Sequence, residues 1–112
     1  MPTISAALLR ERLQADQELS LVNVLPKQTF DRRRIAGSQH ASQYEEDFLE
    51  RIEFIVEHEQ ACVVVYCNSK GCNAASKAAE KLALAGYTNV LELDGGLAAW
   101  ESLSFPVQGS AV

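Results

Sequence analysis

The chain contains the stretch ACVVVYCNSKGCNAA at residues 61–75, and this stretch decides the fold. Its first six residues are apolar on both faces, which is typical of an inner strand of a parallel sheet covered by helices. Asn73 is a suitable N-cap for a helix that we expect to reach Ala85, with Gly86 as its stop. A strand that passes through a short loop into a helix predicts an α/β fold.

The rest of the chain continues this alternation. Hydrophobic spacing predicts helices over residues 5–16, 44–57 and 97–103, a helical turn over 28–33, and strands over 19–25 and 87–93. The first helix is expected to bury Leu8, Leu9 and Leu13, and the second Phe48, Leu49, Ile52, Ile55 and Val56. The order predicts a mainly parallel central sheet flanked by helices, with ligands bound beyond the carboxyl ends of the strands. Cys67 lies at such a position.

The composition is that of a soluble globular protein. The 112 residues are 47% hydrophobic and 22% charged, with a formal net charge of -5, so we expect one domain over residues 1–112 and no nucleic-acid partner. The basic run Arg32-Arg33-Arg34 is interpreted as a solvated face. Charged residues interrupt the first twenty residues, and no apolar run is long enough to span a membrane. We therefore expect a cytoplasmic protein without a membrane partner.

Three cysteines, Cys62, Cys67 and Cys72, fall within eleven residues. An odd number excludes a complete set of disulfides within one chain. The spacing of five and five does not match a zinc ligand pair, and neither histidine is near in sequence, so no metal is expected. Cys62 lies within the predicted strand, where a free cysteine behaves as a small hydrophobic residue.

The loop after the strand favours nucleophilic chemistry at Cys67. Gly71 would let backbone N–H groups turn inward as an anion-binding nest, and the helix N-terminus adds unpaired N–H groups. Both would lower the thiol pKa from ~8.5 towards ~6.5 and make the thiolate dominant. The same cradle could hold a Cys67 persulfide. The expected binding residues are those of the loop: Asn68, Ser69, Lys70, Gly71, Cys72 and Asn73.

These features resemble the rhodanese-like domain family. The segment after Val64 resembles the family's active-site loop. Further similar segments are Leu21-Val22-Asn23-Val24, Phe30 to Ser38, Gly86-Tyr87-Thr88-Asn89-Val90, Asp94-Gly95-Gly96-Leu97-Ala98-Ala99-Trp100 and Phe105-Pro106-Val107. The resemblance implies a three-layer fold and an enzyme that moves sulfane sulfur from thiosulfate or a persulfide to cyanide or a thiol through a Cys67 persulfide. Donor and acceptor would be small molecules or proteins, and no cofactor is implied.

The sequence also departs from the family pattern. Asn23 and Leu25 replace the common Asp-x-Arg, while Arg34 and Ala36 replace the histidine and proline of the His-Ile-Pro-Gly motif. The active-site loop is longer than the common form and lacks its arginine, which leaves Lys70 as the loop's only cation. A longer loop enlarges the pocket, so a donor unlike thiosulfate is plausible.

Several alternatives remain open at this stage. Related phosphatases and arsenate reductases place an arginine six residues after the cysteine to bind an oxyanion bidentately, but this chain has Asn73 there. A non-catalytic interaction module with the same fold is another alternative. Cys72 either packs at the start of the helix or acts as a resolving thiol. His40 is either structural or near the pocket rim. The sequence does not determine the natural donor, the acceptor or the oligomeric state.

Overall fold

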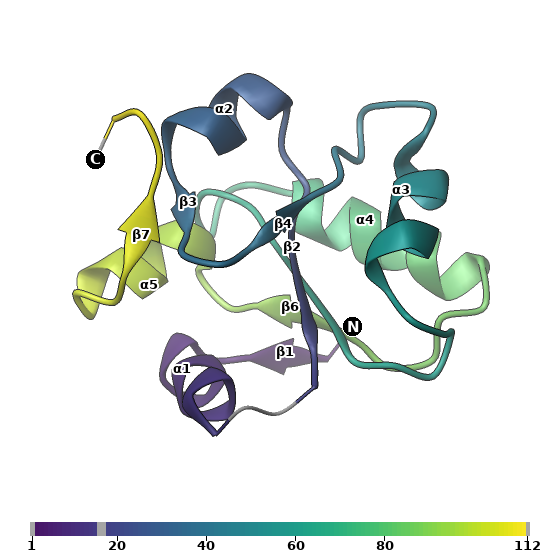
Figure 1. Ribbon diagram of the computed structural model, residues 1–112, viewed down its shortest axis with the longest axis horizontal. Helices are drawn as coiled ribbons and strands as arrows, with labels where there is room; N and C mark the ends of the chain where they lie inside the picture. Colours follow the sequence, from purple (N-terminus) through teal and green to yellow (C-terminus); the bar gives the residue numbers. More distant parts are fainter. Residues whose placement is uncertain (1, 16–17, 112) are drawn as a thin grey trace.

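The computed structural model describes residues 2–15 and 18–111, in which strands and helices alternate (Figure 1). The helices are α1 (Ala6–Gln14), α2 (Lys27–Arg32), α3 (Phe48–Ile55), α4 (Ala74–Leu84) and α5 (Gly96–Ser102). The strands are β1 (Thr3–Ile4), β2 (Ser20–Asn23), β3 (Arg34–Ile35), β4 (Gln39–His40), β5 (Val63–Tyr66), β6 (Val90–Leu93) and β7 (Val107–Gln108).

Five strands form a parallel central sheet in the order β1-β6-β5-β2-β4. The predicted α/β fold with a mainly parallel sheet is therefore confirmed. Strand β5 lies in the middle, and all four of its residues are buried, as the apolar run predicts. Strands β3 and β7 form a separate antiparallel pair. Neither β1 nor β7 was expected, because each has only two residues and too little sequence for a pattern.

The side chains of β5 alternate between two hydrophobic clusters, one on each face of the sheet. Val63 and Val65 belong to the cluster that includes buried residues of α3 and α4. Val64 and Tyr66 belong to the other cluster, which includes Trp100 and further residues of α1 and α5. Helices thus cover both faces and give three layers, with α3 and α4 on the opposite side from α1 and α5 (Figure 1).

The helix ends follow local chemistry. The Ser5 hydroxyl accepts a hydrogen bond from the Leu8 amide (3.1 Å) and caps α1, whereas Asp16, the expected end of this helix, lies outside the described residues. Asn73 occupies the N-cap position of α4, but its side chain makes no capping hydrogen bond. Gly86 follows the end of α4 with φ of +102°, a conformation that favours glycine, so its predicted role is confirmed.

Two apolar residues that were expected in the core are exposed. Leu8 and Leu49 are each 40% exposed. The buried residues of α1 are Ala6 and Leu9, and those of α3 are Phe48 and Ile52, so the covered stripe of each helix is narrower than its apolar spacing predicts. Helix α3 is also shorter than the predicted 44–57, because its C-cap, Val56, is already extended although its side chain stays buried.

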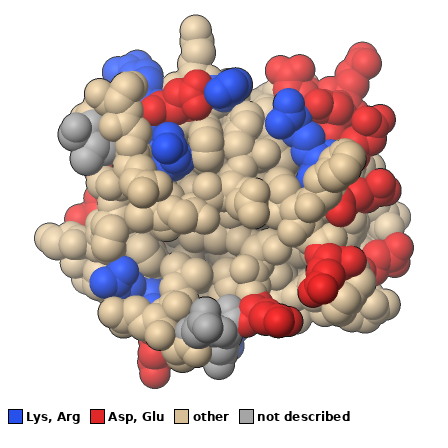
Figure 2. Space-filling model, viewed as in Figure 1, with Lys and Arg blue, Asp and Glu red and all other residues tan. Residues whose placement is uncertain are grey.

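Charge is unevenly distributed over the surface. Figure 2 shows acidic side chains gathered on the side where α3 lies, with lysines and arginines scattered over the same view. The basic run is not simply solvated: Arg33 pairs with Glu101, and the Arg34 guanidinium lies 4.7 Å from the centre of the Phe30 ring. None of the described helices is both long and apolar enough to cross a membrane.

Candidate active site

Cys67 is delivered by the central strand to the carboxyl edge of the sheet. It directly follows β5, and the neighbouring β2 stays paired there through a hydrogen bond from the Val24 amide to the Tyr66 carbonyl (3.2 Å). The alternation along the strand turns the Cys67 side chain towards the α3–α4 face, in the same cluster as Ala74 of α4. The residue is only 3% exposed. The proposed nucleophile is therefore covered in this structure.

The loop that covers Cys67 is itself open to solvent. Asn68, Ser69, Lys70, Gly71 and Asn73 are exposed, and Cys72 is half-buried. A hydrogen bond from the Cys72 amide to the Ser69 carbonyl (3.1 Å) closes a turn within the loop. Gly71 has no left-handed φ and has open space around it. The expected nest built on Gly71 is thus not present, although all six predicted binding residues belong to one exposed loop.

The polar groups around the Cys67 sulfur favour a neutral thiol. Its Sγ–H donates to the Cys72 carbonyl oxygen (3.4 Å), and the Ser69 carbonyl oxygen is 3.8 Å from Sγ. Burial and then the neighbouring Cys72 thiol raise the pKa of Cys67 to about 11, and backbone contacts with Ala75 and Ser69 offset only part of this rise. The predicted low pKa is therefore wrong for this conformation, because burial of the sulfur outweighs the backbone hydrogen bonds of Ala75 and Ser69 that lower the pKa.

The start of α5 fixes the backbone of the candidate nucleophile. The amides of Leu97 and Ala98 donate to the carbonyls of Cys67 and Asn68, each at 2.8 Å. Gly96 has a φ of +58°, and a Cβ atom there would lie 2.4 Å from the Cys67 carbonyl oxygen. In the sequence, Gly95 and Gly96 were noted only as part of a segment that resembles the family. The Gly-Gly pair before a helix is the signal that could have indicated this close approach.

The buried hydroxyl of Tyr66 is hydrogen-bonded to residues 35 and 38, at and just after β3. The Tyr66 hydroxyl accepts from the Ile35 amide (3.0 Å) and is hydrogen-bonded to the Ser38 hydroxyl (2.8 Å). On β2, the Asn23 side-chain oxygen accepts from the Leu25 amide (2.9 Å). Polar side chains are thus hydrogen-bonded at the end of β5, which precedes Cys67, and at the end of the neighbouring β2. Sequence reasoning treated Tyr66 only as part of an apolar strand.

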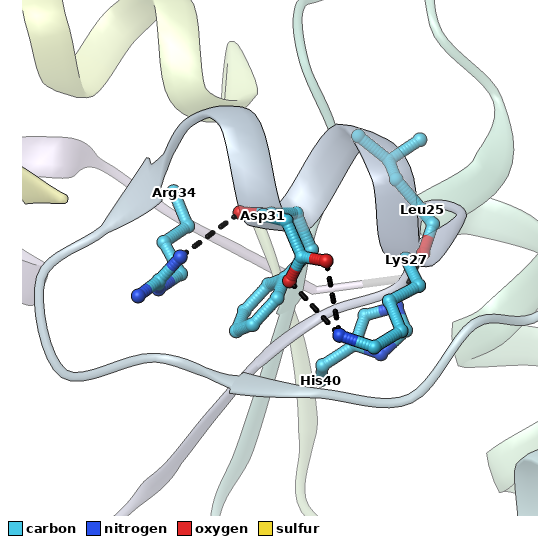
Figure 3. Close-up of polar contacts among 6 residues, drawn as sticks. Leu25, Lys27, Asp31, Arg34 and His40 are labelled. Atoms are coloured by element: carbon cyan, nitrogen blue, oxygen red, sulfur yellow. Dashed lines mark hydrogen bonds and ion pairs between the residues drawn. The ribbon is translucent and has the colours of Figure 1, made fainter. Parts of the chain in front are cut away.

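His40 belongs to a packed cluster beside α2 rather than to the loop after β5 (Figure 3). Its Nε2 lies 2.7 Å from the Leu25 carbonyl oxygen, and its ring centre is 4.8 Å from that of Phe30. Arg34 covers the same Phe30 ring and donates to its carbonyl (3.2 Å). These contacts support the structural interpretation of His40.

Lys81 of α4 is hydrogen-bonded to Gln43, in the segment that follows β4. Lys81 Nζ donates to the Gln43 backbone carbonyl and to its side-chain oxygen (3.0 Å). The Gln43 amide in turn donates to the Val24 carbonyl (3.0 Å), which ties this segment to the end of β2. Within residues 2–15 and 18–111, no three His, Cys, Asp or Glu side chains gather as a metal site.

Comparison with known proteins supports the resemblance seen in the sequence. A family model of the rhodanese-like domain matches residues 5–103. Similar solved structures include the BH2092 protein from Bacillus halodurans, with 25% identity, a TM-score of 0.85, and coverage of 98% of this chain and 78% of that chain. The rhodanese-like domain of the Alr3790 protein from Anabaena sp. has 27% identity and a TM-score of 0.85, covering 99% of this chain and 81% of that one.

One similar structure has an enzyme name. The thiosulfate sulfurtransferase from Pseudomonas aeruginosa is 25% identical with a TM-score of 0.80, and the match covers 97% of this chain but 20% of that chain. The search of curated proteins found no match.

Proposed function

Because the chain belongs to the rhodanese-like domain family, we propose that it is a sulfurtransferase with Cys67 as its nucleophile. The observation that carries this proposal is the position of Cys67 at the carboxyl end of the central strand, with an exposed loop in front of it. The likeness to a thiosulfate sulfurtransferase supports the reaction class. Ligands of parallel α/β sheets bind at this edge.

The reaction has two steps that share one covalent intermediate. The Cys67 thiolate attacks the sulfane sulfur of a donor such as thiosulfate; a new S–S bond forms, the donor's S–S bond breaks, and sulfite leaves with that bond's electron pair. Cyanide or a thiolate then attacks the outer sulfur of the persulfide and restores the Cys67 thiolate. Each step is a simple displacement at sulfur, so no redox cofactor is needed.

The loop from Asn68 to Asn73 is proposed to receive the donor. Its residues are exposed apart from the half-buried Cys72, and Lys70 supplies a positive charge that attracts an anionic donor. Since the resting sulfur is covered and protonated, loading requires the loop to release it from the Cys72 carbonyl. The backbone hydrogen bonds of Ser69 and Ala75, which already lower the pKa of Cys67, then stabilise the anionic sulfur. The donor and acceptor, whether small molecules or proteins, would meet the enzyme in the cytoplasm, where thiols remain reduced.

Intact-mass measurement tests the proposal. The protein is incubated with thiosulfate, or separately with a low-molecular-weight persulfide, and then desalted. We expect a gain of one sulfur atom, about 32 Da, that cyanide removes and that Cys67→Ser abolishes. Cys62→Ser is the matched control and should load like the wild type. If neither donor adds sulfur to any variant that retains Cys67, the sulfurtransferase proposal is wrong and the interaction-module alternative gains support.

A further inference from the structure

Cys67 and Cys72 form a pair of thiols in the resting structure. The Cys67 sulfur contacts the backbone carbonyl oxygen of Cys72 (3.4 Å), and the neighbouring Cys72 thiol is one cause of the raised pKa of Cys67. Both residues are free cysteines, and Cys72 packs against the same hydrophobic cluster that contains Cys67. The second thiol thus lies beside the reacting atom rather than elsewhere on the helix.

The segment between the two cysteines is able to rearrange. Asn68, Ser69, Lys70 and Gly71 are exposed, and one backbone hydrogen bond closes the turn from Ser69 to Cys72. Gly71 has open space around it. Beyond the hydrogen bond from the Ala98 amide to the Asn68 carbonyl, little packing therefore opposes the movement needed to bring the two sulfurs to bonding distance. A disulfide requires such an approach of the two side chains.

We propose that Cys72 is a resolving thiol that discharges the Cys67 persulfide as hydrosulfide. This inference rests on the sulfurtransferase function proposed above. The Cys72 sulfur attacks Sγ of Cys67, the Cys67–Cys72 disulfide forms, and the bond between Sγ and the sulfane sulfur breaks. The departing sulfur takes the electron pair of that bond and leaves as HS⁻ with the proton that Cys72 gives up. The sulfane sulfur is reduced by two electrons, and the two cysteines are oxidised by two. Two molecules of a low-molecular-weight thiol then reduce the disulfide.

The contact identifies which sulfur is attacked. Residue Cys72 contacts Sγ of Cys67 through its backbone carbonyl, and this Sγ is the atom that becomes the inner sulfur of the persulfide. Attack on that atom gives a disulfide and free sulfide. Attack on the outer sulfur would instead move the sulfane sulfur onto Cys72, and a purely structural Cys72 would leave the persulfide intact. The three possibilities give different products.

The test uses the full chain loaded with a low-molecular-weight persulfide, desalted, and left without an added acceptor. In the wild type we expect the added sulfur to disappear while about one equivalent of sulfide per chain is released, and the mass to fall about two units below that of the reduced protein. Peptide mapping should join the segments that contain Cys67 and Cys72. A thiol reductant should restore the original mass. Cys62→Ser should behave like the wild type.

Cys72→Ser separates this inference from the proposed function. Serine keeps the loop backbone and removes only the thiol, so the variant should retain the added sulfur at least tenfold longer and release it to cyanide. If the wild type retains its persulfide as long as Cys72→Ser does, the resolving role is wrong and the sulfurtransferase proposal stands. Sulfur mapped to Cys72 would also overturn the resolving role. If neither the wild type nor Cys72→Ser gains sulfur, the proposed function fails and the resolving role fails with it.

Discussion

At the scale of single residues, the surroundings of Cys67 decide when it can react. Burial and the neighbouring Cys72 thiol both raise its pKa, and the Cys72 carbonyl accepts the thiol proton. A thiol is a poor nucleophile until it is deprotonated. The Cys67 thiol is therefore protected in this conformation, and under the proposed function a donor would react only with chains whose loop has opened.

The pH dependence of alkylation tests this protected state. With a pKa of about 11, Cys67 should react slowly with iodoacetamide at pH 7, and its rate should rise roughly tenfold per pH unit up to that value. The measurement is the modification rate of the Cys67 peptide by mass spectrometry. In Cys72→Ser the midpoint should move to lower pH, because one cause of the raised pKa is gone. A wild-type rate that is already constant above pH 8 would contradict the prediction.

Tyr66 gives a second prediction at this scale. Tyr66→Phe removes a buried hydroxyl that accepts from the Ile35 amide and bonds to Ser38. The buried amide would lose its partner, so the free energy of unfolding should fall by about 1–3 kcal/mol. Urea unfolding measures the change. Tyr44→Phe, on an exposed side chain, is the control and should change stability by less than about 0.5 kcal/mol. An equal loss in both variants would contradict the role assigned to the Tyr66 hydroxyl.

The sequence indicates the position of Cys67 but not its ionisation. A strand followed by a glycine-containing loop and a helix correctly places a cysteine at the sheet edge. Whether amides or carbonyls face the sulfur depends on the orientation of individual peptide planes in the loop, which residue types leave open. Gly71 permits a nest without requiring one, and here its backbone has no left-handed φ.

At the scale of elements, the contact between α5 and the loop links two distant parts of the chain. The first amides of α5 are used by the carbonyls of Cys67 and Asn68, so they are not free for a substrate. Gly96 makes this contact possible because its missing side chain leaves room for the Cys67 carbonyl. Helix α5 therefore fixes the position of the Cys67 backbone through hydrogen bonds and makes no use of a side chain for this contact.

Gly96→Ala should disturb both the fold and the site. Its Cβ atom would lie 2.4 Å from the Cys67 carbonyl oxygen, which forces the helix or the loop to move. The matched control is Gly37→Ala, which has a φ of +81° but nothing within 4 Å and so tests backbone strain alone. That strain costs roughly 1–2 kcal/mol. Unfolding measurements should show a larger loss for Gly96→Ala, and persulfide loading should slow in this variant only. Equal losses in both would show that close approach is unimportant.

Helix existence was easier to predict than helix length. Hydrophobic spacing indicated α1 and α3, because each buries a stripe of side chains, whereas Asn73 and Gly86 indicated the two ends of α4. The spacing also placed Leu8 and Leu49 in the core, although both are exposed, because it does not show where a neighbouring element stops covering the helix. The strand expected from residue 87 begins at Val90, because the Tyr87 amide is still bonded to the Leu82 carbonyl at the end of α4.

At the scale of the whole molecule, the buried thiol and phenol groups link stability to pH. Burial raises the pKa values of Cys67 and Tyr66 in the folded state. For Cys67 the value rises from 9.0 to about 11. Below pH 9 the Cys67 thiol is protonated in both the folded and the unfolded state, so its full contribution to the free energy of unfolding is present. Between these values the unfolded chain loses its proton first, so the free energy of unfolding falls as pH rises, until the contribution is lost above the folded pKa.

Urea unfolding at pH 8 and pH 10.5 measures this linkage. We expect lower stability at pH 10.5, with a smaller decrease in Cys67→Ala, which removes one of the linked groups. Comparing the decrease in the wild type with that in Cys67→Ala separates the contribution of Cys67 from those of the lysines and tyrosines that titrate in the same pH range. A decrease of the same size in both proteins would contradict a raised pKa at Cys67.

The order of strands has a consequence for synthesis of the chain. Strand β1 is made first, yet its neighbour in the sheet is β6, which begins at Val90. Since residues leave the ribosome in order, the earliest strand must wait for one of the last. A nascent chain that ends before residue 90 already carries Cys67 and its loop. It has neither the partner of β1 nor the amides of Leu97 and Ala98, so the surroundings of Cys67 are completed only after residue 98 has been made.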